Sequence, residues 1–289
     1  MENIGYVCIN GKMLAADTPI FTAQNRAFRY GDALFETIRC IQLIPQFFED
    51  HYRRLLRGMT LLKMQINSLP TREKLEEMMA QLISRNRIYG DCRIRLSVYR
   101  SDGGLYTPAS NKAEFLIEAS PLTTQGYKLN TKGLLTGLFI NEGKSSSSLN
   151  AFKSANALLF VLAGLEKQAH NWQDILICND KGYIIEGLSS NLFWIKDDKV
   201  FTPLRASGCV EGVMRKQILR LLRTNGYQLE EVPGATRKEL FEADELFLTN
   251  AIQGIQWIVG FEDKRYYCRL VKEISRLLNN LIRSAEELV

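Results

Sequence analysis

A stretch of thirty residues, Glu186 to Arg215, constrains the fold of this chain more than any other segment. It brings together the carboxylate of Glu186, the turn Ser189-Ser190-Asn191, two short apolar segments and a glycine-led helix start. Short strands also alternate with helices along the rest of the chain, and no βαβ spacing is repeated. This arrangement predicts an α+β fold rather than a doubly wound parallel sheet.

The first half of the chain is predicted to form one α+β domain, residues 1–120. A hairpin is expected around Asn10-Gly11, because this dipeptide favours a two-residue turn between strands. Further along, apolar residues at strand or helix spacing predict strands at 34–41, 92–100 and 114–119 and helices at 47–64 and 72–87. The polar segment 121–133 contains a proline and a glycine, which predicts a linker.

The second half, residues 134–289, is predicted to be a separate α+β domain. Its apolar segments predict strands at 134–140, 175–179, 183–186, 191–196, 199–202 and 245–249 and helices at 211–224 and 271–288. Another apolar helix is expected to start near Lys153. The lysine and four serines at 144–148, just before it, predict a mobile loop. That loop is either a plain connector or a cover for a substrate.

Composition excludes several classes of function. The net charge is +5 over 289 residues and the basic residues are spread along the chain, so no nucleic-acid partner is expected. The longest apolar run, 157–165, is about half of the ~20 residues of a membrane span, and no leader segment is recognisable. The six cysteines form no CxxC pair, which predicts reduced thiols in a cytoplasmic protein. With only two histidines and no ligand spacing, no metal site is predicted.

Two side chains of the second half have surroundings that suggest chemistry. Lys153 lies among small residues just before an apolar stretch, which favours a desolvated amine suited to Schiff-base formation. The common alternative is a solvated surface charge. Glu186 ends an apolar strand and precedes a glycine, so it is either an exposed residue capping a hairpin or a buried carboxylate facing a ring nitrogen. Asn191 is expected to fix the neighbouring loop through its amide.

A predicted helix begins at Gly212. It is either an ordinary helix start or a set of N–H groups, those of Val213 and Met214 included, aimed at a phosphate that glycine allows to approach closely. A lysine amine, a carboxylate for a ring nitrogen and a helix N-terminus for a phosphate are the three groups that pyridoxal phosphate needs. We therefore predict a pyridoxal-phosphate site that contains Lys153, Glu186 and this helix.

Taken in order, these segments resemble the signature of the class IV aminotransferases. These are the fold-type IV pyridoxal-phosphate enzymes: branched-chain and D-amino-acid aminotransferases and 4-amino-4-deoxychorismate lyase. The matching motifs are Glu186-x-x-x-x-Asn191-Leu192-Phe193, Val200-x-Thr202 and Val210-x-Gly212-Val213-x-Arg215. In the first half, AFRYGDALFETIRC resembles the family's YG…FE…R motif and EDHYRRL its phosphate-arginine motif. One position departs, since Leu188 stands where a small residue is usual. The resemblance implies a two-domain fold of the D-amino-acid aminotransferase type.

The resemblance also implies roles for individual residues. Lys153 carries the cofactor as a Schiff base and moves the proton, Glu186 pairs with the pyridine nitrogen, and Arg54 binds the phosphate. Backbone N–H groups also hold the phosphate, those of Val213, Met214, Asn250 and Ala251. The substrate-carboxylate side is lined, in different members, by positions that match Arg39, Arg95 and Arg100. For each of these three arginines, a solvated strand residue is an equal alternative.

Two activities fit this resemblance. The first is an aminotransferase that moves an amino group between an amino acid and a 2-oxo acid, with branched-chain amino acids among the candidate substrates. The second is 4-amino-4-deoxychorismate lyase, which makes 4-aminobenzoate and pyruvate for folate synthesis; segments 31–37 and 248–255 are closer to its lyase-like members. The aminotransferase is placed first because more aminotransferases share the signature. A silent scaffold would lack the lysine or the carboxylate, and both are present. The resemblance further implies a homodimer.

Overall fold

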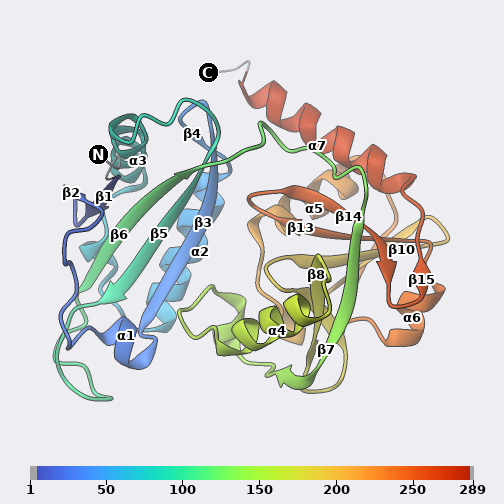
Figure 1. Cartoon of the computed structure of the whole chain (residues 1–289), viewed down its shortest axis with the longest axis horizontal. Helices are drawn as coiled ribbons and strands as arrows, with labels where there is room; N and C mark the ends of the chain where they lie inside the picture. The colour runs from blue at the N-terminus through green and yellow to red at the C-terminus, as the bar shows by residue number, and fades with distance from the viewer. Residues whose placement is uncertain (1–4, 287–289) are drawn as a thin grey trace. The chain divides into compact units, whose positions relative to one another are not determined.

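The computed structural model describes the backbone of residues 5–286 and the side chains of residues 5–283. The chain divides into two compact units (Figure 1). The first extends to Gly126 and also includes Phe152–Asn156, while the second consists of Tyr127–Ala151 and the chain from Ala157 onward. The sequence predicted a linker over 121–133, but it did not predict that residues 152–156 belong to the first unit.

A six-stranded antiparallel sheet is the frame of the first unit. Its strands are β1 (Tyr6–Ile9), β2 (Lys12–Ala15), β3 (Ala33–Ile41), β4 (Ile44–Pro45), β5 (Cys92–Arg100) and β6 (Ala113–Pro121). They lie in the order β2-β1-β6-β5-β3-β4. The predicted hairpin is confirmed: Asn10 and Gly11 have φ angles of 49° and 84°, the positive values that such a turn requires.

Helices cover one face of this sheet (Figure 1). They are α2 (Phe48–Leu61) and α3 (Arg72–Arg85), accompanied by the short α1 (Arg26–Tyr30) and the 3-10 turn η1 (Ile66–Ser68). Leu55 and Met59 of α2 pack with Leu75 and Met79 of α3 in the core, and all four are at most 2% exposed. Burial of each such side chain contributes ~1.5–3 kcal/mol. The apolar residues whose spacing predicted α2 and α3 therefore also hold these helices on the sheet.

The segment that contains Lys153 is extended, not helical. The Phe35 N–H donates to the Lys153 carbonyl at 2.8 Å, and the Ala155 N–H donates to the Ala33 carbonyl at 2.9 Å. This pairing is available because β4 pairs only with the C-terminal end of β3 and leaves its N-terminal half as an edge. The prediction of a helix start at Lys153 is therefore wrong: the helix begins five residues later, at Leu158.

A nine-stranded sheet forms the second unit. Its strands are β7 (Leu134–Lys144), β8 (Asp174–Asn179), β9 (Ile184–Gly187), β10 (Asn191–Lys196), β11 (Lys199–Pro203), β12 (Leu229–Val232), β13 (Glu245–Asn250), β14 (Gly254–Phe261) and β15 (Lys264–Arg265). The main order is β12-β11-β10-β13-β14-β7-β8-β9. Because β9 pairs with both β8 and β10, the strands from β10 round to β9 close into a barrel.

The helices of the second unit surround this barrel. They are α4 (Leu158–Ala169), α5 (Val213–Thr224), α6 (Arg237–Glu242) and α7 (Leu270–Glu286), with the 3-10 turns η2 (Ser148–Ala151) and η3 (Arg205–Ser207). The predicted C-terminal helix is α7, although the last two residues of its predicted range lie outside the described residues. Within the described range, no helix is both long and apolar enough to cross a membrane.

Helix α4 is only partly buried, in contrast to the buried helix that the sequence predicted. Ala163 faces a small core of Phe139, Ile175 and Ile177. The opposite side carries four apolar side chains that are at least 50% exposed, those of Leu158, Val161, Leu162 and Leu165. Their spacing of three or four residues places them in one stripe along the helix.

Strands β12 and β14 and helix α6 were not predicted. β12 and α6 are four and six residues long, too short for a clear periodic pattern. β14 begins at Gly254 and contains Gly260, which interrupt the apolar pattern of a strand. The remaining predicted helices and strands are confirmed within a few residues.

Candidate active site

Glu186 is buried at the end of β9, with 2% of its surface exposed. On the neighbouring strands, its partners in the sheet are Ile177 of β8 and Asn191 of β10. Its Oε1 forms an ion pair with the Lys144 ammonium, and its Oε2 accepts a hydrogen bond of 2.9 Å from the Val210 N–H. Glu186 is thus a buried carboxylate, and the alternative that it is an exposed residue capping a hairpin is wrong.

Lys144 corrects the prediction of a mobile loop over 144–148. It is the last residue of β7 and is 6% exposed. The loop that follows is also tied down, because Ser146 donates from its N–H and from its hydroxyl to the Asp180 carboxylate. The four serines alone suggested flexibility, and the sequence held no sign that the lysine before them is paired.

Asn191 fixes the segment that precedes α5, as predicted. Its Nδ2 donates to the Val210 carbonyl at 2.7 Å. The glycine at 212 is required by this contact, since a Cβ there would lie 1.9 Å from the Asn191 Oδ1. Gly212 has a φ of −65°, so close packing rather than a left-handed conformation explains the glycine.

The N-terminus of α5 is suited to an anion. No side chain caps it, and its first turn contains no acidic residue. Val213 and Met214 are buried, and the Arg215 guanidinium is anchored away from the helix end on the Pro203 carbonyl at 2.7 Å and on Glu231 at 2.8 Å. Unsatisfied N–H groups and the positive end of the helix dipole favour a phosphate at such a position.

The turn at Asn250 and Ala251 joins β13 to β14. The Asn250 Oδ1 accepts from the N–H groups of Ile252 at 3.0 Å and Gln253 at 2.8 Å, so its side chain closes the turn. The Tyr127 hydroxyl donates to the Ala251 carbonyl at 3.0 Å. These contacts use the Asn250 side chain and the Ala251 carbonyl, so the phosphate role that was predicted for these two residues belongs to their backbone N–H groups.

In the first unit, Lys153 is half-buried beside the aromatic ring of Phe35. Its Nζ lies 5.0 Å from the ring centroid, and the Arg95 guanidinium lies 3.8 Å from the same centroid. The two cations therefore approach one side chain, although their residues are 58 positions apart. The sequence named both residues, but it did not indicate that they share a neighbour.

Arg54 belongs to a buried cluster with Glu36 and His51. Its Nε and Nη2 donate to the two Glu36 oxygens at 2.8 and 2.5 Å, and the His51 Nδ1 lies 2.6 Å from Oε2. Burial opposes ionisation of Glu36, but the charge of Arg54 and the hydrogen bonds from His51 and Arg54 outweigh it and lower the pKa of Glu36 to about 2. Glu36 is therefore ionised and can only accept, which makes the His51 Nδ1 the donor.

His51 is neutral in this cluster. Burial lowers the pKa of His51, and the charges of Arg54 and Lys153 lower it further against the opposing effect of Glu36. Because Nδ1 carries the proton, Nε2 is an acceptor, and it is buried without a hydrogen-bond partner among the described residues. Glu36 and His51 were not predicted as site residues, although both lie inside the two motifs that carried the resemblance.

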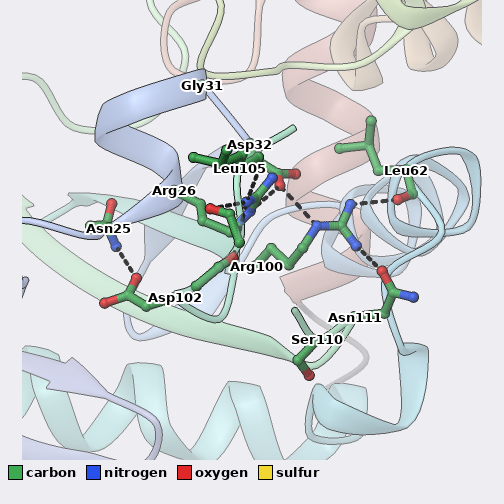
Figure 2. Close-up of polar contacts among 12 residues, drawn as sticks. Asn25, Arg26, Gly31, Asp32, Leu62, Arg100, Asp102, Leu105, Ser110 and Asn111 are labelled. Carbon is green, nitrogen blue, oxygen red and sulfur yellow. Dashed lines mark hydrogen bonds and ion pairs between the residues drawn. The ribbon is translucent and has the colours of Figure 1, made fainter. Parts of the chain in front are cut away.

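The three predicted substrate arginines differ in exposure. Arg39 is 1% exposed and forms an ion pair of 2.6 Å with Asp91. Arg100 is 6% exposed and donates to Asp32 at 2.8 Å, to the Leu62 carbonyl at 2.6 Å and to Asn111 at 2.5 Å (Figure 2). The Arg95 side chain is 35% exposed and lies 3.8 Å from Glu118.

Asp32 pairs with Arg100 and also with Arg26, which contacts the loop at 103–105. Figure 2 shows its carboxylate beside Arg26 as well, at 2.9 Å. Arg26 in turn donates to the carbonyls of Gly103 at 3.1 Å and Leu105 at 2.6 Å. Arg26 therefore holds the 103–105 loop in place, and Asp32 links Arg26 to Arg100.

The groups of each unit fit a part of pyridoxal phosphate. In the second unit, a buried carboxylate with acceptor capacity suits a ring nitrogen and an uncapped helix end suits a phosphate; in the first unit, a half-buried lysine suits covalent attachment. The orphan acceptor of His51 beside Arg54 is a further polar group for which a bound ligand would supply a partner.

Comparison with known proteins identifies the family. The sequence pattern of the family described as amino-transferase class IV matches residues 33–260. The probable branched-chain-amino-acid aminotransferase of Aquifex aeolicus (strain VF5) is 29% identical over 278 residues, covering 91% of this chain and 86% of that protein. The aminodeoxychorismate lyase of Vibrio harveyi is 28% identical over 239 residues, covering 82% and 85% respectively.

Solved structures show the same fold. A branched-chain aminotransferase from Thermoproteus uzoniensis, crystallised with norvaline, has a TM-score of 0.85 at 22% identity and covers 95% of this chain and 93% of its own. A putative 4-amino-4-deoxychorismate lyase from Legionella pneumophila has a TM-score of 0.82 at 23% identity, covering 92% and 96%. The predicted two-domain fold of fold-type IV is thereby confirmed.

Since the family pattern spans well over half of its length, the chain belongs to the class IV aminotransferases. It is a pyridoxal-phosphate-dependent enzyme, as the resemblance implied.

Proposed function

We propose that this enzyme is an aminotransferase that moves an amino group between an amino acid and a 2-oxo acid. The observation that carries the proposal is the pair of cations beside Phe35: Lys153 supplies an amine, and Arg95 supplies a partly exposed guanidinium beside the same ring. An α-amino acid and its 2-oxo acid each carry one α-carboxylate, so one guanidinium is enough to anchor either of them. Both react at the cofactor, which needs the amine for its attachment.

Lys153 and Glu186 are assigned the chemical roles. When bound, pyridoxal phosphate supplies an electron sink that makes the Cα proton of an amino acid removable. Lys153 would hold the cofactor covalently, and once the amino group of the substrate has replaced it there, the freed Lys153 amine would accept that proton and return it. Glu186, which burial and two donors keep in one orientation, holds the ring nitrogen through its carboxylate.

The phosphate is assigned to Arg54 and to backbone N–H groups. The uncapped first turn of α5 supports phosphate binding by the N–H groups of Val213 and Met214. The turn after β13 supports phosphate binding by the N–H groups of Asn250 and Ala251. For Arg54 the support is a guanidinium held by Glu36 in a fixed orientation, which reduces the entropy lost on binding.

Substrate recognition is assigned to Arg95 rather than to Arg39 or Arg100. Arg39 is buried and paired with Asp91, and Arg100 is buried and paired with Asp32. If a substrate carboxylate took the place of either aspartate, the charge of that aspartate would be left without a partner. Arg95 can turn toward a carboxylate at much smaller cost because it is partly solvated. Branched-chain amino acids are the first substrates to test, given the aminotransferases among the similar proteins.

Aminodeoxychorismate lyase is the second candidate. The lyases of similar sequence favour it. Aminodeoxychorismate carries two carboxylates, whereas an exposed guanidinium is found at only one of the three arginines considered, and this difference places the aminotransferase first.

One pair of assays tests the proposal. The purified enzyme is incubated with pyridoxal phosphate, an amino-acid panel and 2-oxoglutarate, and glutamate formation is measured; aminodeoxychorismate is supplied separately, and 4-aminobenzoate is measured. Glutamate formation with at least one amino acid is expected. Release of 4-aminobenzoate without any transamination would replace the proposal by the lyase.

We also propose a homodimer in which the exposed stripe of α4 is covered. Leu158, Val161, Leu162 and Leu165 present a continuous apolar surface, and an isologous contact places such a stripe against its own copy. Sedimentation of the wild type should give a dimer, and Leu162→Glu should shift it toward the monomer. Lys181→Glu, an exposed change elsewhere, should not; a dimer that survives Leu162→Glu would remove α4 from the interface.

We infer that the enzyme works in the cytoplasm. Cys40 and Cys92 face each other on β3 and β5, and both are free thiols. The Cys92 hydrogen bond, with burial, raises the pKa of Cys40 well above its usual range. Adjacent cysteines that remain thiols suit a reducing compartment.

A further inference from the structure

Lys144 is placed with little freedom at the end of β7. Its carbonyl accepts from the Asp180 N–H at 3.0 Å. The residue before it has to be small, since a Cβ at Gly143 would lie 3.0 Å from the Asn179 carbonyl oxygen. The Lys144 Nζ lies 5.2 Å from the ring centroid of Phe160 and contacts the Glu186 Oε1. Backbone and side chain are therefore both fixed.

The Lys144–Glu186 pair is almost completely removed from water. Their side chains are 6% and 3% exposed. A buried charge without a partner is strongly disfavoured, so each of the two charges depends on the other. The Val210 N–H holds the second carboxylate oxygen at 2.9 Å, so that Glu186 is gripped at both oxygens.

We propose that Lys144 is a positioning residue for Glu186: its ammonium supplies the buried counter-charge of the carboxylate and holds it oriented toward the ring nitrogen of the cofactor. The inference rests on the proposed role of Glu186. An ionised carboxylate has about four lone-pair positions, and two of them are used by Lys144 and Val210. Acceptor capacity is thus left for a third donor.

The same geometry separates Lys144 from the attachment role of Lys153. The ring nitrogen and the aldehyde carbon lie at opposite ends of the pyridine ring. A lysine in contact with the carboxylate that holds the nitrogen cannot reach the aldehyde at the same time. Lys144 therefore acts through Glu186 and does not touch the reacting carbon.

Removing the ammonium changes the preferred location of one proton. In Lys144→Met the buried carboxylate loses its counter-charge, and it is neutralised at least cost by taking the proton from the ring nitrogen. The nitrogen then becomes neutral, and the ring is a weaker electron sink. Lys144→Arg keeps the charge and should lose less.

The test uses the full-length protein with pyridoxal phosphate labelled with ¹⁵N in the ring. The variants are Lys144→Met, Lys144→Arg, Glu186→Gln and the double variant, with Lys181→Met as an exposed control. In the wild type the ¹⁵N resonance should have the upfield position of a protonated pyridine, and Lys144→Met should move it downfield. Turnover should fall roughly 10-fold or more, the equivalent of about 1.4 kcal/mol.

Thermal unfolding of the cofactor-free variants gives a readout independent of turnover. The double variant has neither buried charge, so it should unfold at a higher temperature than Glu186→Gln. In the Glu186→Gln background, Lys144→Met should change turnover little. A wild-type ¹⁵N position in Lys144→Met, or turnover losses that add, would overturn the inference. If the wild type itself fails to retain pyridoxal phosphate, the proposed function falls, and this inference with it.

Discussion

Each unit of the enzyme contains a buried glutamate paired with a cation, Glu36 in the first and Glu186 in the second, and the two are held differently. Glu36 and Glu186 are both 2% exposed. Glu36 accepts two hydrogen bonds from Arg54 and one from His51, and its pKa is lowered to about 2. Glu186 accepts one ion pair from Lys144 and one backbone hydrogen bond.

The difference indicates different duties. A carboxylate saturated by a bidentate guanidinium and an imidazole has little left to offer a ligand, so Glu36 orients Arg54 and His51. A carboxylate with a single ammonium and a single N–H is held in place but retains acceptor capacity. Burial alone therefore does not show whether a carboxylate can accept from a ligand; the number of donors that the chain itself supplies also decides it.

Lys153→Ala should have the largest effect. Lys144 pairs with Glu186, whereas Lys153 is the lysine assigned to covalent attachment. Its loss should abolish borohydride-trapped cofactor and lower turnover by ~10³-fold or more, since both attachment and proton transfer are removed. Peptide mapping after reduction checks this, and Lys144→Met should keep the label on Lys153. A label found on Lys144 would exchange the roles of the two lysines.

Glu186→Gln should lower both turnover and stability, because it leaves the buried Lys144 ammonium without its partner, whereas Glu36→Gln should lower mainly stability. Glu186→Gln should still fold and bind cofactor but turn over roughly 10²-fold more slowly, the equivalent of about 3 kcal/mol. Glu36→Gln breaks a larger buried network and should lose about 3–5 kcal/mol of unfolding free energy. Turnover per bound cofactor and urea unfolding measure the two effects. Wild-type turnover in Glu186→Gln would reduce that residue to a strand end.

Arg54→Ala should come next and lower cofactor affinity, in addition to the stability that is lost when the buried Glu36 has no guanidinium partner. A charge-assisted contact is worth ~1.5–3 kcal/mol, or roughly 10- to 150-fold in affinity. The variant should lose cofactor on dialysis and recover much of its rate in excess pyridoxal phosphate. Arg53→Ala is the matched control, because Arg53 is 67% exposed and pairs only with its helix neighbour Glu49 among the described residues. The reverse result would shift the assignment of the motif by one residue.

The smallest effect concerns His51 and pH. Burial lowers the pKa of His51, so the unfolded chain binds a proton below about pH 6.5 while the folded chain resists it. Stability should therefore fall as pH drops from about 7 to 5, a window in which Glu36 stays ionised in the folded state. In His51→Asn the melting temperature should depend less on pH; an unchanged slope would show that other groups cause it.

The sequence was sufficient for the motifs and for much of the secondary structure. The helices at α2, α3 and α5 and the strands at β5 and β10 follow from the spacing of apolar residues, which is a local property. The family, the fold and the cofactor could be predicted for a related reason: the motifs that carry them are contiguous. Helix α4 shows the limit of local reasoning, since an equally apolar run can face a core or remain exposed.

Only the tertiary structure decided which charges meet. Lys144 and Glu186 are 42 residues apart, and Arg100 and Asp32 are 68 apart. Whether an arginine is engaged, as Arg39 and Arg100 are, or partly solvated, as Arg95 is, depends on which strands become neighbours. A side chain's type sets the charge it can carry, but its partner and its distance from water are set by segments far away in the chain.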